Sequence, residues 1–259
     1  MPEAGERCAA CQRGVRAGTQ FCPGCGQTLV ASAAVPVRSA PVARSSQFAE
    51  HWEELKRIGW LFGLLLATSL VFGMASRGVS SPWPEVAMSV IDAVIVLAAL
   101  GLRYQKLRFV FKLHPLGRRG ATALLIAAIA FVGLGSLYFW VLQQLGVPIA
   151  SATGSLARAG WPVWAMLLLF SVMPAVFEEI AFRGVIQSSL ERILNTRDAW
   201  LIQAALFSVL HLSPLMFPSH FLMGLCFGYM RRRSRSVYPG MALHAMWNAL
   251  ILFQELAAS

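Results

Sequence analysis

From residue 58 to the C-terminus, the chain alternates between long uncharged stretches and short polar segments. Ile58–Ser76, Ala121–Leu145 and Trp161–Phe177 contain no charged residue, and Val86–Leu102 contains only Asp92. A transmembrane helix needs about 20 mostly apolar residues. Each of these stretches therefore predicts one membrane-spanning helix.

The next uncharged stretch, Ala199–Met230, is too long for a single span, because its 32 residues would form a helix of about 48 Å. Pro214 and Pro218 divide it, so we expect a hairpin of two helices with a tight turn. Val237–Phe253 predicts the last span. The pattern thus predicts an all-α fold, a polytopic transmembrane helical bundle of about seven spans.

The six loops between these spans alternate in their content of lysine and arginine. In chain order they hold 1, 6, 1, 3, 0 and 4 of these residues. Cytoplasmic loops are enriched in them, so the even-numbered loops are predicted to be cytoplasmic. This orientation places the N-terminus inside and the C-terminus outside, in the cytoplasmic (inner) membrane if the cell is prokaryotic.

The composition agrees with a membrane protein. Of 259 residues, 57% are hydrophobic and 13% are charged, and the charged share is about half of that in soluble domains. The net charge of +10 comes largely from basic loops, so we interpret it as a topology signal and do not expect nucleic acid as a partner. The first apolar stretch begins near Ile58, too deep for a secretory signal peptide, and none is expected.

The N-terminal residues carry a different signal. Cys8-x-x-Cys11 is followed ten residues later by Cys22-x-x-Cys25. This is the spacing of a short zinc ribbon, in which four thiolates hold a structural zinc ion. We therefore predict a zinc-ribbon module at residues 1–30. Two disulfides are the alternative, which a reducing cytoplasmic location disfavours.

Residues 31–50 are rich in Ala, Ser, Pro and Val, and they predict a flexible linker to a transmembrane domain at residues 51–259. A short amphipathic stretch begins near Phe48–Arg57, with Trp52 and Trp60 as expected anchors at the membrane interface. We expect the zinc ribbon to contact a protein partner. The lone Cys226, in an apolar helix, is expected to be a core residue.

Ionisable residues at membrane depth are costly and mark functional sites. In Glu178-Glu179-x-x-x-Arg183, the second glutamate and the arginine are four residues apart on a helix, so Glu179 and Arg183 are expected to pair. Glu178 points about 100° away and is left as a carboxylate able to act as a base. The alternative is a charge cluster at a helix end.

Two more motifs lie on later spans: Phe207-x-x-x-His211 and His244-x-x-x-Asn248. The second places two hydrogen-bond donors on one helical face, as the stabilisation of an oxyanion requires. The alternatives are a hydrogen-bonded core histidine for His211 and interhelical hydrogen bonds for the other pair. Helix lengths place both motifs and Glu178 at one depth, in a cavity open to the cytoplasm.

Together, and in this order on separate spans, the three motifs resemble the CPBP family. These are intramembrane proteases that include CAAX prenyl proteases and bacteriocin-processing enzymes, also called Abi proteins. The resemblance covers roughly residues 160–255. It implies an endopeptidase similar to type II CAAX prenyl proteases, acting on a membrane-associated or lipid-modified protein or peptide. The motifs that carry it are Glu178-Glu179-Ile-Ala-Phe-Arg183, Phe207-Ser-Val-Leu-His211 and His244-Ala-Met-Trp-Asn248.

The resemblance also implies roles for these residues. Glu178 is the expected general base, and His211 shares in activating water. His244 and Asn248 are expected to hold the oxyanion. Glu179 and Arg183, within the first motif, are expected to form a pair that gives structural support.

Two other functions stay open. The first is a zinc-dependent intramembrane metalloprotease with Glu178, His211 and His244 as ligands; the chain has no His-Glu-x-x-His motif, so we expect no catalytic metal. The second is a non-enzymatic membrane scaffold or immunity protein. His220 lies near the outer turn and is expected to be structural, and Asp92 is left without a role.

Overall fold

The computed structural model describes residues 7–15, 22, 24, 25, 41–76, 81–151 and 153–258. The chain divides into two compact units, Met1–Ala49 and Glu50–Ser259. In the first unit, an isolated bridge joins Arg7 and Gly14 beside the cysteines. Residues 31–40 of the predicted linker lie outside the described residues, whereas its residues 41–50 are helical.

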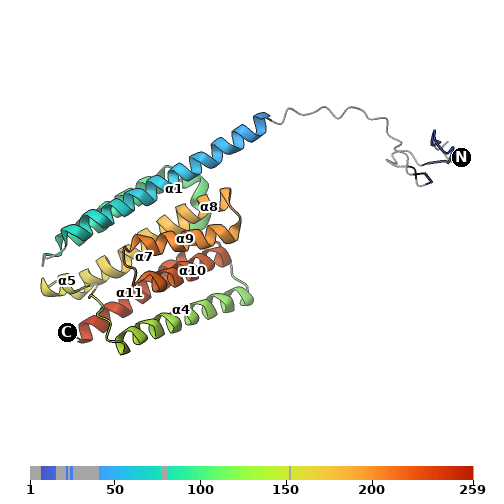
Figure 1. Ribbon diagram of the computed structural model, residues 1–259. Coiled ribbons are helices and arrows are strands. Elements are labelled where there is room, and N and C mark those ends of the chain that lie inside the picture. The colour runs from blue at the N-terminus through green and yellow to red at the C-terminus, as the bar shows by residue number, and fades with distance from the viewer. Residues whose placement is uncertain are drawn as a thin grey trace. The chain divides into compact units, whose positions relative to one another are not determined.

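The rest of the described chain is built from helices and their connecting loops, as the hydropathy pattern predicts (Figure 1). In chain order these are α1 (Pro41–Ala75), α2 (Trp83–Gly101), α3 (Tyr104–Leu107), the 3₁₀ segment η1 (Arg108–Phe111), α4 (Arg118–Gln144), α5 (Gly154–Arg158), α6 (Val163–Met166), the π segment η2 (Leu167–Val172), α7 (Met173–Glu179), the π segment η3 (Ile180–Ile186), α8 (Gln187–Ile193), α9 (Thr196–Leu210), α10 (Phe217–Ser234) and α11 (Tyr238–Ala258).

Two helices are longer than the sequence pattern predicts. The amphipathic stretch and the first span belong to one helix, α1, on which Trp52 and Trp60 are exposed. Elements α6 to α8 likewise join into one helix, Val163–Ile193, interrupted by two π segments. Pro174 follows the first of these, where its missing backbone N–H removes a regular helical hydrogen bond. Despite this lost bond, the helix continues past Glu178 and Glu179 as far as Ile193.

Within the described residues, four helices are long and apolar enough to cross a membrane: Phe48–Ala75, Trp83–Gly101, Arg118–Gln144 and Val163–Ile193. The predicted count of seven spans is not confirmed. With 15 residues, α9 is about 22 Å long, shorter than a hydrocarbon core of about 30 Å. Helix α10 carries three arginines in its last turn. The predicted hairpin of two helices is present as α9 and α10.

This hairpin packs closely because α10 has glycines at Gly224 and Gly228. A Cβ on Gly224 would lie 2.7 Å from Cα of Ala204, closer than real Cβ atoms approach. Spacing of small residues by four lets helix backbones come this near. The Gln203 amide then donates to the carbonyl of Gly224 at 2.8 Å. Helix α10 also packs against α4 and α11, which makes it the central helix (Figure 1).

The three loops predicted to be cytoplasmic lie at one end of the bundle. Glu54 on α1 accepts from Nη2 of Arg103 at 2.6 Å and from Nη1 of Arg192 at 3.3 Å, so it ties the second loop to the fourth. The backbone N–H of Val237 donates to the carbonyl of Val110 at 3.0 Å, which ties the sixth loop to the second. The basic loops therefore gather as the lysine and arginine count predicts.

The other connections meet at the opposite end. The Ser155 hydroxyl donates to Glu85 at 2.5 Å, and the backbone N–H of Thr153 donates to Glu255 at 3.0 Å. The Tyr138 hydroxyl donates to the carbonyl of Leu215 in the α9–α10 turn. The connecting loops therefore gather at two opposite ends of the bundle. The cytoplasmic position of the N-terminus stays a prediction.

Gly224→Ala should lower the stability of the bundle, because its methyl group would overlap Ala204 and separate α9 from α10. We expect a loss of about 1–3 kcal/mol, measured as a lower midpoint of thermal unfolding in detergent. Gly133→Ala is the matched control, since no atom lies within 4 Å of its added Cβ and alanine favours a helix. Equal midpoints for the two variants would contradict this account of the packing.

Candidate functional site

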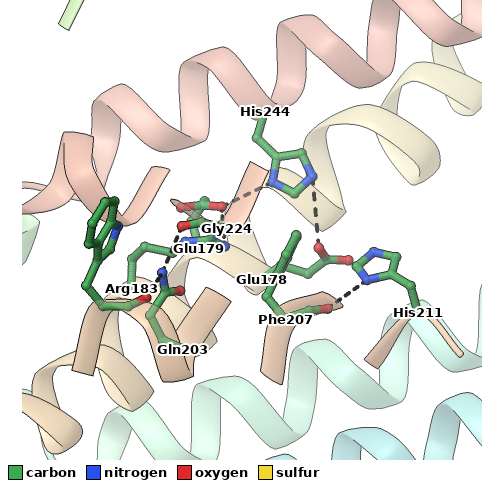
Figure 2. Close-up of polar contacts among 9 residues, drawn as sticks. Glu178, Glu179, Arg183, Gln203, Phe207, His211, Gly224 and His244 are labelled. Carbon is green, nitrogen blue, oxygen red and sulfur yellow. Dashed lines mark hydrogen bonds and ion pairs between the residues drawn. The ribbon is translucent and has the colours of Figure 1, made fainter. Parts of the chain in front are cut away.

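Polar side chains from three separate helical regions meet inside the bundle (Figure 2). Glu178, Glu179 and Arg183 come from the long Val163–Ile193 helix, His244 from α11, and His211 from the residue that follows α9. The sequence places the first three within six residues, whereas only the fold brings the histidines to them. The predicted site residues are thus largely gathered at one place.

The centre of this cluster is the carboxylate of Glu179, which is fully buried. Its Oε1 accepts from Nη1 of Arg183 at 2.8 Å and from Nδ1 of His244 at 3.2 Å. The pairing of Glu179 with Arg183 is as the i, i+4 spacing predicts. The bond to His244 is additional, and it links the long helix to α11 (Figure 2).

Arg183 is also fully buried, and aromatic rings surround it. Its guanidinium carbon lies 4.3 Å from the ring centroid of Phe207 and 5.3 Å from that of Phe227. The faces of aromatic rings attract cations, most strongly where water is absent. Phe207, the first residue of the Phe-x-x-x-His motif, therefore holds the arginine in place as well as filling the core.

Glu178 differs from its neighbour, because its side chain keeps 28% of its surface exposed. Its Oε2 is buried, makes no hydrogen bond to a described residue and lies 3.9 Å from Nε2 of His244. A gap of this size between two polar atoms is one that a water molecule can bridge. Glu178 is therefore the carboxylate in this cluster that is available to a ligand.

The contacts define which nitrogen of His244 holds a proton. Nδ1 faces the Oε1 of Glu179, and a carboxylate can only accept, so Nδ1–H is the donor. Nε2 is then either the lone pair of a neutral ring or the second N–H of an imidazolium.

His211 lies beside this cluster. Its Nδ1 donates to the carbonyl of Phe207 at 2.9 Å, so its Nε2 is left for another partner. The Phe207 ring lies near both histidines, with its centroid 5.0 Å from that of His211 and 6.2 Å from that of His244. Helix α9 ends just before His211, so this residue belongs to the turn rather than to a helix interior.

The His220 ring lies beside that of His211, with centroids 3.7 Å apart and the rings tilted by 34°, and the structural role expected for His220 stays a prediction. Its Nδ1 donates to the carbonyl of Met216 at 2.9 Å, in the same manner as His211 bonds its own helix. The predicted hairpin is the feature of the sequence that indicates this contact, because a turn between positions 211 and 220 brings the two rings together. His220 belongs to none of the three motifs.

Asn248 does not contact the charged cluster directly. Its Nδ2 donates to the carbonyl of Phe170 at 3.1 Å. In a regular helix this carbonyl would accept from residue 174, but that residue is proline and has no N–H. The asparagine therefore fills the hydrogen bond that Pro174 leaves open, one turn of α11 away from His244.

Two further polar residues in the spans are accounted for. Asp92 accepts a hydrogen bond from the Thr68 hydroxyl at 2.5 Å, which links α2 to α1. Cys226 is buried in the core, as predicted, and its thiol donates to the carbonyl of Ala127 at 3.4 Å.

The cysteine module has the geometry of a metal site. The four sulfur atoms of Cys8, Cys11, Cys22 and Cys25 all lie within 4.8 Å of one another. The sulfur atoms of Cys8 and Cys25 are 3.6 Å apart and those of Cys11 and Cys22 are 3.5 Å apart, near the ~3.8 Å edge of a tetrahedron with zinc–sulfur bonds of about 2.3 Å. These distances are far from the ~2.05 Å of a disulfide. The residues therefore fit a four-thiolate metal site.

Local hydrogen bonding prepares one of these thiols. The backbone N–H of Gly24 donates to Cys22 Sγ at 3.4 Å, and this contact lowers the pKa of the Cys22 thiol to about 6. A thiolate is the form that binds a metal. Within the described residues, the ligand atoms of these four cysteines lie close enough together to hold one metal ion. The ligand atoms of Glu178, His211 and His244 are not grouped so closely.

Comparison with known proteins points to the same segment. Residues 160–250 match the family model described as "Type II CAAX prenyl endopeptidase Rce1-like". The chain is 25% identical over 91 residues to the Bacillus subtilis (strain 168) protein named "Putative membrane peptidase YdiL", a match that covers 35% of this chain and 37% of that protein. No solved structure matches the chain. The matched segment contains all three motifs, which confirms the resemblance drawn from them.

Arg183→Gln should destabilise the bundle by about 3–5 kcal/mol, because it leaves the buried Glu179 carboxylate without its guanidinium. The double variant Glu179→Gln/Arg183→Gln replaces both charges with neutral amides and should recover part of that loss. Thermal unfolding in detergent measures both effects. Arg197→Gln, at an exposed arginine at the start of α9, should change little. A double variant no more stable than the single one would contradict the predicted pairing energy.

Proposed function

We propose that this protein is an intramembrane endopeptidase that hydrolyses a peptide bond of a membrane-associated protein or peptide. The observation that carries the proposal is the Glu178 Oε2, which is buried, unbonded and 3.9 Å from His244 Nε2. A carboxylate and an imidazole at this separation can hold one water molecule between them. The similarity of residues 160–250 to the Rce1-like family and to a protein named as a peptidase supports the same class.

In the proposed reaction, Glu178 is the general base and takes a proton from water as the water oxygen attacks the carbonyl carbon of the substrate. His211 assists with its Nε2, since its Nδ1 is bonded to Phe207. The carbonyl oxygen becomes an oxyanion. When the C–N bond breaks, Glu178 returns the proton to the leaving amine, so that one product ends in a carboxylic acid, which ionises in water, and the other begins with an amine.

The oxyanion is proposed to accept hydrogen bonds from His244 and Asn248. Because Nδ1 of His244 donates to Glu179, its Nε2 can donate to the oxyanion only when the ring is an imidazolium. Glu179 therefore acts as the counter-charge that holds the imidazolium in position. Asn248 uses one amide N–H on Phe170 and has a second for the oxyanion.

The proposed substrate class follows from the family similarity. We propose cleavage near a lipid-modified C-terminus, as in CAAX processing, with leader peptides as the other class to be tested. The proposed orientation has the N-terminus and the three basic loops in the cytoplasm. The active site would then receive its substrate from the cytoplasmic side of the membrane.

Glu178→Gln should abolish cleavage while preserving the fold, because it keeps the side-chain shape and removes the base. In liposomes containing the purified chain, a panel of farnesylated, unmodified and leader-type peptides would be followed by mass spectrometry. We expect a loss of at least about 100-fold, the lower range for general-base catalysis. Glu53→Gln is the control, since this glutamate is exposed and pairs with Lys56 at the surface.

Full cleavage by the Glu178→Gln protein would show that another group is the base. If the wild-type chain cleaved none of the peptides, the balance would move to the non-enzymatic scaffold or immunity protein. That alternative also requires any phenotype of the chain to survive the Glu178→Gln substitution.

We also propose that the cysteine tetrad binds a structural zinc ion and that this module contacts a protein partner. A metal held by four cysteines has no open position for a substrate, so its contribution is to folding. The rival metalloprotease would bind a second zinc ion through Glu178, His211 and His244. Counting zinc per chain separates these possibilities.

Purified wild-type protein should contain about one zinc ion per chain by elemental analysis, and Cys8→Ser should lose it because three thiolates bind zinc far more weakly. Cys226→Ala should keep its zinc, since that thiol lies in the core. A zinc-free Cys8→Ser protein that still cleaves peptide would argue against catalytic zinc. About two zinc ions in the wild type and one in the variant would instead support the metalloprotease.

A further inference from the structure

A cavity of about 410 Å³ lies where the start of α4 meets the end of α10, and it shares no residue with the candidate active site. Its walls carry the basic residues Arg119, Arg233 and Arg235, together with His114. All three arginines are exposed. They come from the second and sixth loops, which the lysine and arginine count assigns to the same side of the membrane.

The positive charge of this cavity is not compensated by acidic residues. Neither residues 103–120 nor residues 231–239 contain an aspartate or a glutamate. Among the described residues, no carboxylate forms an ion pair with Arg119, Arg233 or Arg235, whereas the neighbouring Arg231 pairs with Glu191 at 2.5 Å. A concave site lined by charge of one sign attracts the opposite charge.

The backbone adds to this field. Helix α4 begins at Arg118, and its N-cap, Gly117, has no side chain to bond the first N–H groups. Such groups and the helix dipole favour an anion at a helix N-terminus. The Arg233 guanidinium reaches the same turn, because its Nη2 lies 3.8 Å from the position of a Cβ on Gly120. Arginine binds phosphate oxygens through two parallel hydrogen bonds.

The surroundings of the cavity indicate where the phosphate comes from. Leu113 is 80% exposed, and Phe109 and Leu116 are 42% and 37% exposed. Helix α4, which starts at the cavity, is among the helices long and apolar enough to cross a membrane. A bilayer crossed by α4 would place this cavity where α4 enters it, at the level of the lipid headgroups. Basic pockets between helices on the cytoplasmic side are suited to anionic headgroups.

We propose that this cavity binds the phosphate of an anionic phospholipid, with the exposed apolar side chains beside it in contact with the acyl chains. The phosphate would lie between Arg119, Arg233 and the first turn of α4. Free inorganic phosphate has the same binding chemistry but no apolar part, so it would gain nothing from Leu113 and its neighbours.

The test uses the full chain purified in detergent and titrated with phosphatidylglycerol or phosphatidylcholine, with bound lipid counted by native mass spectrometry. The wild type should retain phosphatidylglycerol selectively. Arg119→Gln/Arg233→Gln should weaken this binding on the order of 25-fold, since each arginine that contacts the bound anionic headgroup should contribute about fivefold. Each single variant should lose about fivefold, which provides a second measurement if the double variant folds poorly.

The matched control is Arg118→Gln/Arg232→Gln, which removes the same charge from the same two helices. Neither arginine lines the cavity, and Arg232 lies over the ring of Trp200 instead. This control should bind phosphatidylglycerol nearly as the wild type does. Equal losses in the two double variants, or equal retention of the two lipids by the wild type, would overturn the proposal.

A parallel titration with inorganic phosphate distinguishes the two sources. Weak phosphate binding beside tight phosphatidylglycerol binding supports the lipid assignment. Phosphate binding as tight as that of the lipid, and lost in Arg119→Gln/Arg233→Gln, would overturn it in favour of a soluble anion.

Discussion

One carboxylate oxygen of Glu179 accepts hydrogen bonds from both Arg183 and His244 inside an apolar helical bundle. Each of these partners would be costly to bury alone, because an ion without a counter-charge loses its hydration for no return. The shared carboxylate fixes the register of α11 against the long helix. It also sets the orientation of the His244 ring, and so directs Nε2 toward Glu178. The stability of the cluster and the geometry of the proposed chemistry therefore rest on the same bonds.

This arrangement requires helices that approach very closely, and glycine provides the space. A Cβ on Gly240 of α11 would lie 2.8 Å from Oε2 of Glu179, so a larger residue there would press on the carboxylate. Gly224 has the same function between α9 and α10, where it brings Phe207 and Phe227 around Arg183. Close packing is therefore what excludes water from the arginine and makes its pairing with Glu179 strong.

The sequence predicts the contacts between side chains that are close together along one helix, and the side of the bundle on which each loop lies. The spacing of Glu179 and Arg183 predicts their pair, and alternating basic loops predict which loops share an end of the bundle. Contacts across large sequence separations were not predictable in this way. The bond from His244 to Glu179 joins positions 65 residues apart, and the contact of the tilted His211 and His220 rings depends on the exact turn between α9 and α10. Hydropathy alone also does not settle the number of spans, because a helix packed among others can be apolar and still be as short as α9.

Asn248 shows how a motif residue can serve the fold and the site together. Pro174 interrupts the hydrogen bonding of the long helix just ahead of Glu178, and the carbonyl of Phe170 would otherwise be left without that donor inside the bundle. The Asn248 amide supplies the missing bond. This bond holds α11 against the interrupted turn, four residues from the imidazole that faces Glu178. An asparagine has two N–H groups, so support for the helix and a hydrogen bond to a substrate oxygen do not compete for the same proton. The proline and the asparagine are therefore best understood as one device, in which a break in one helix positions a donor on another.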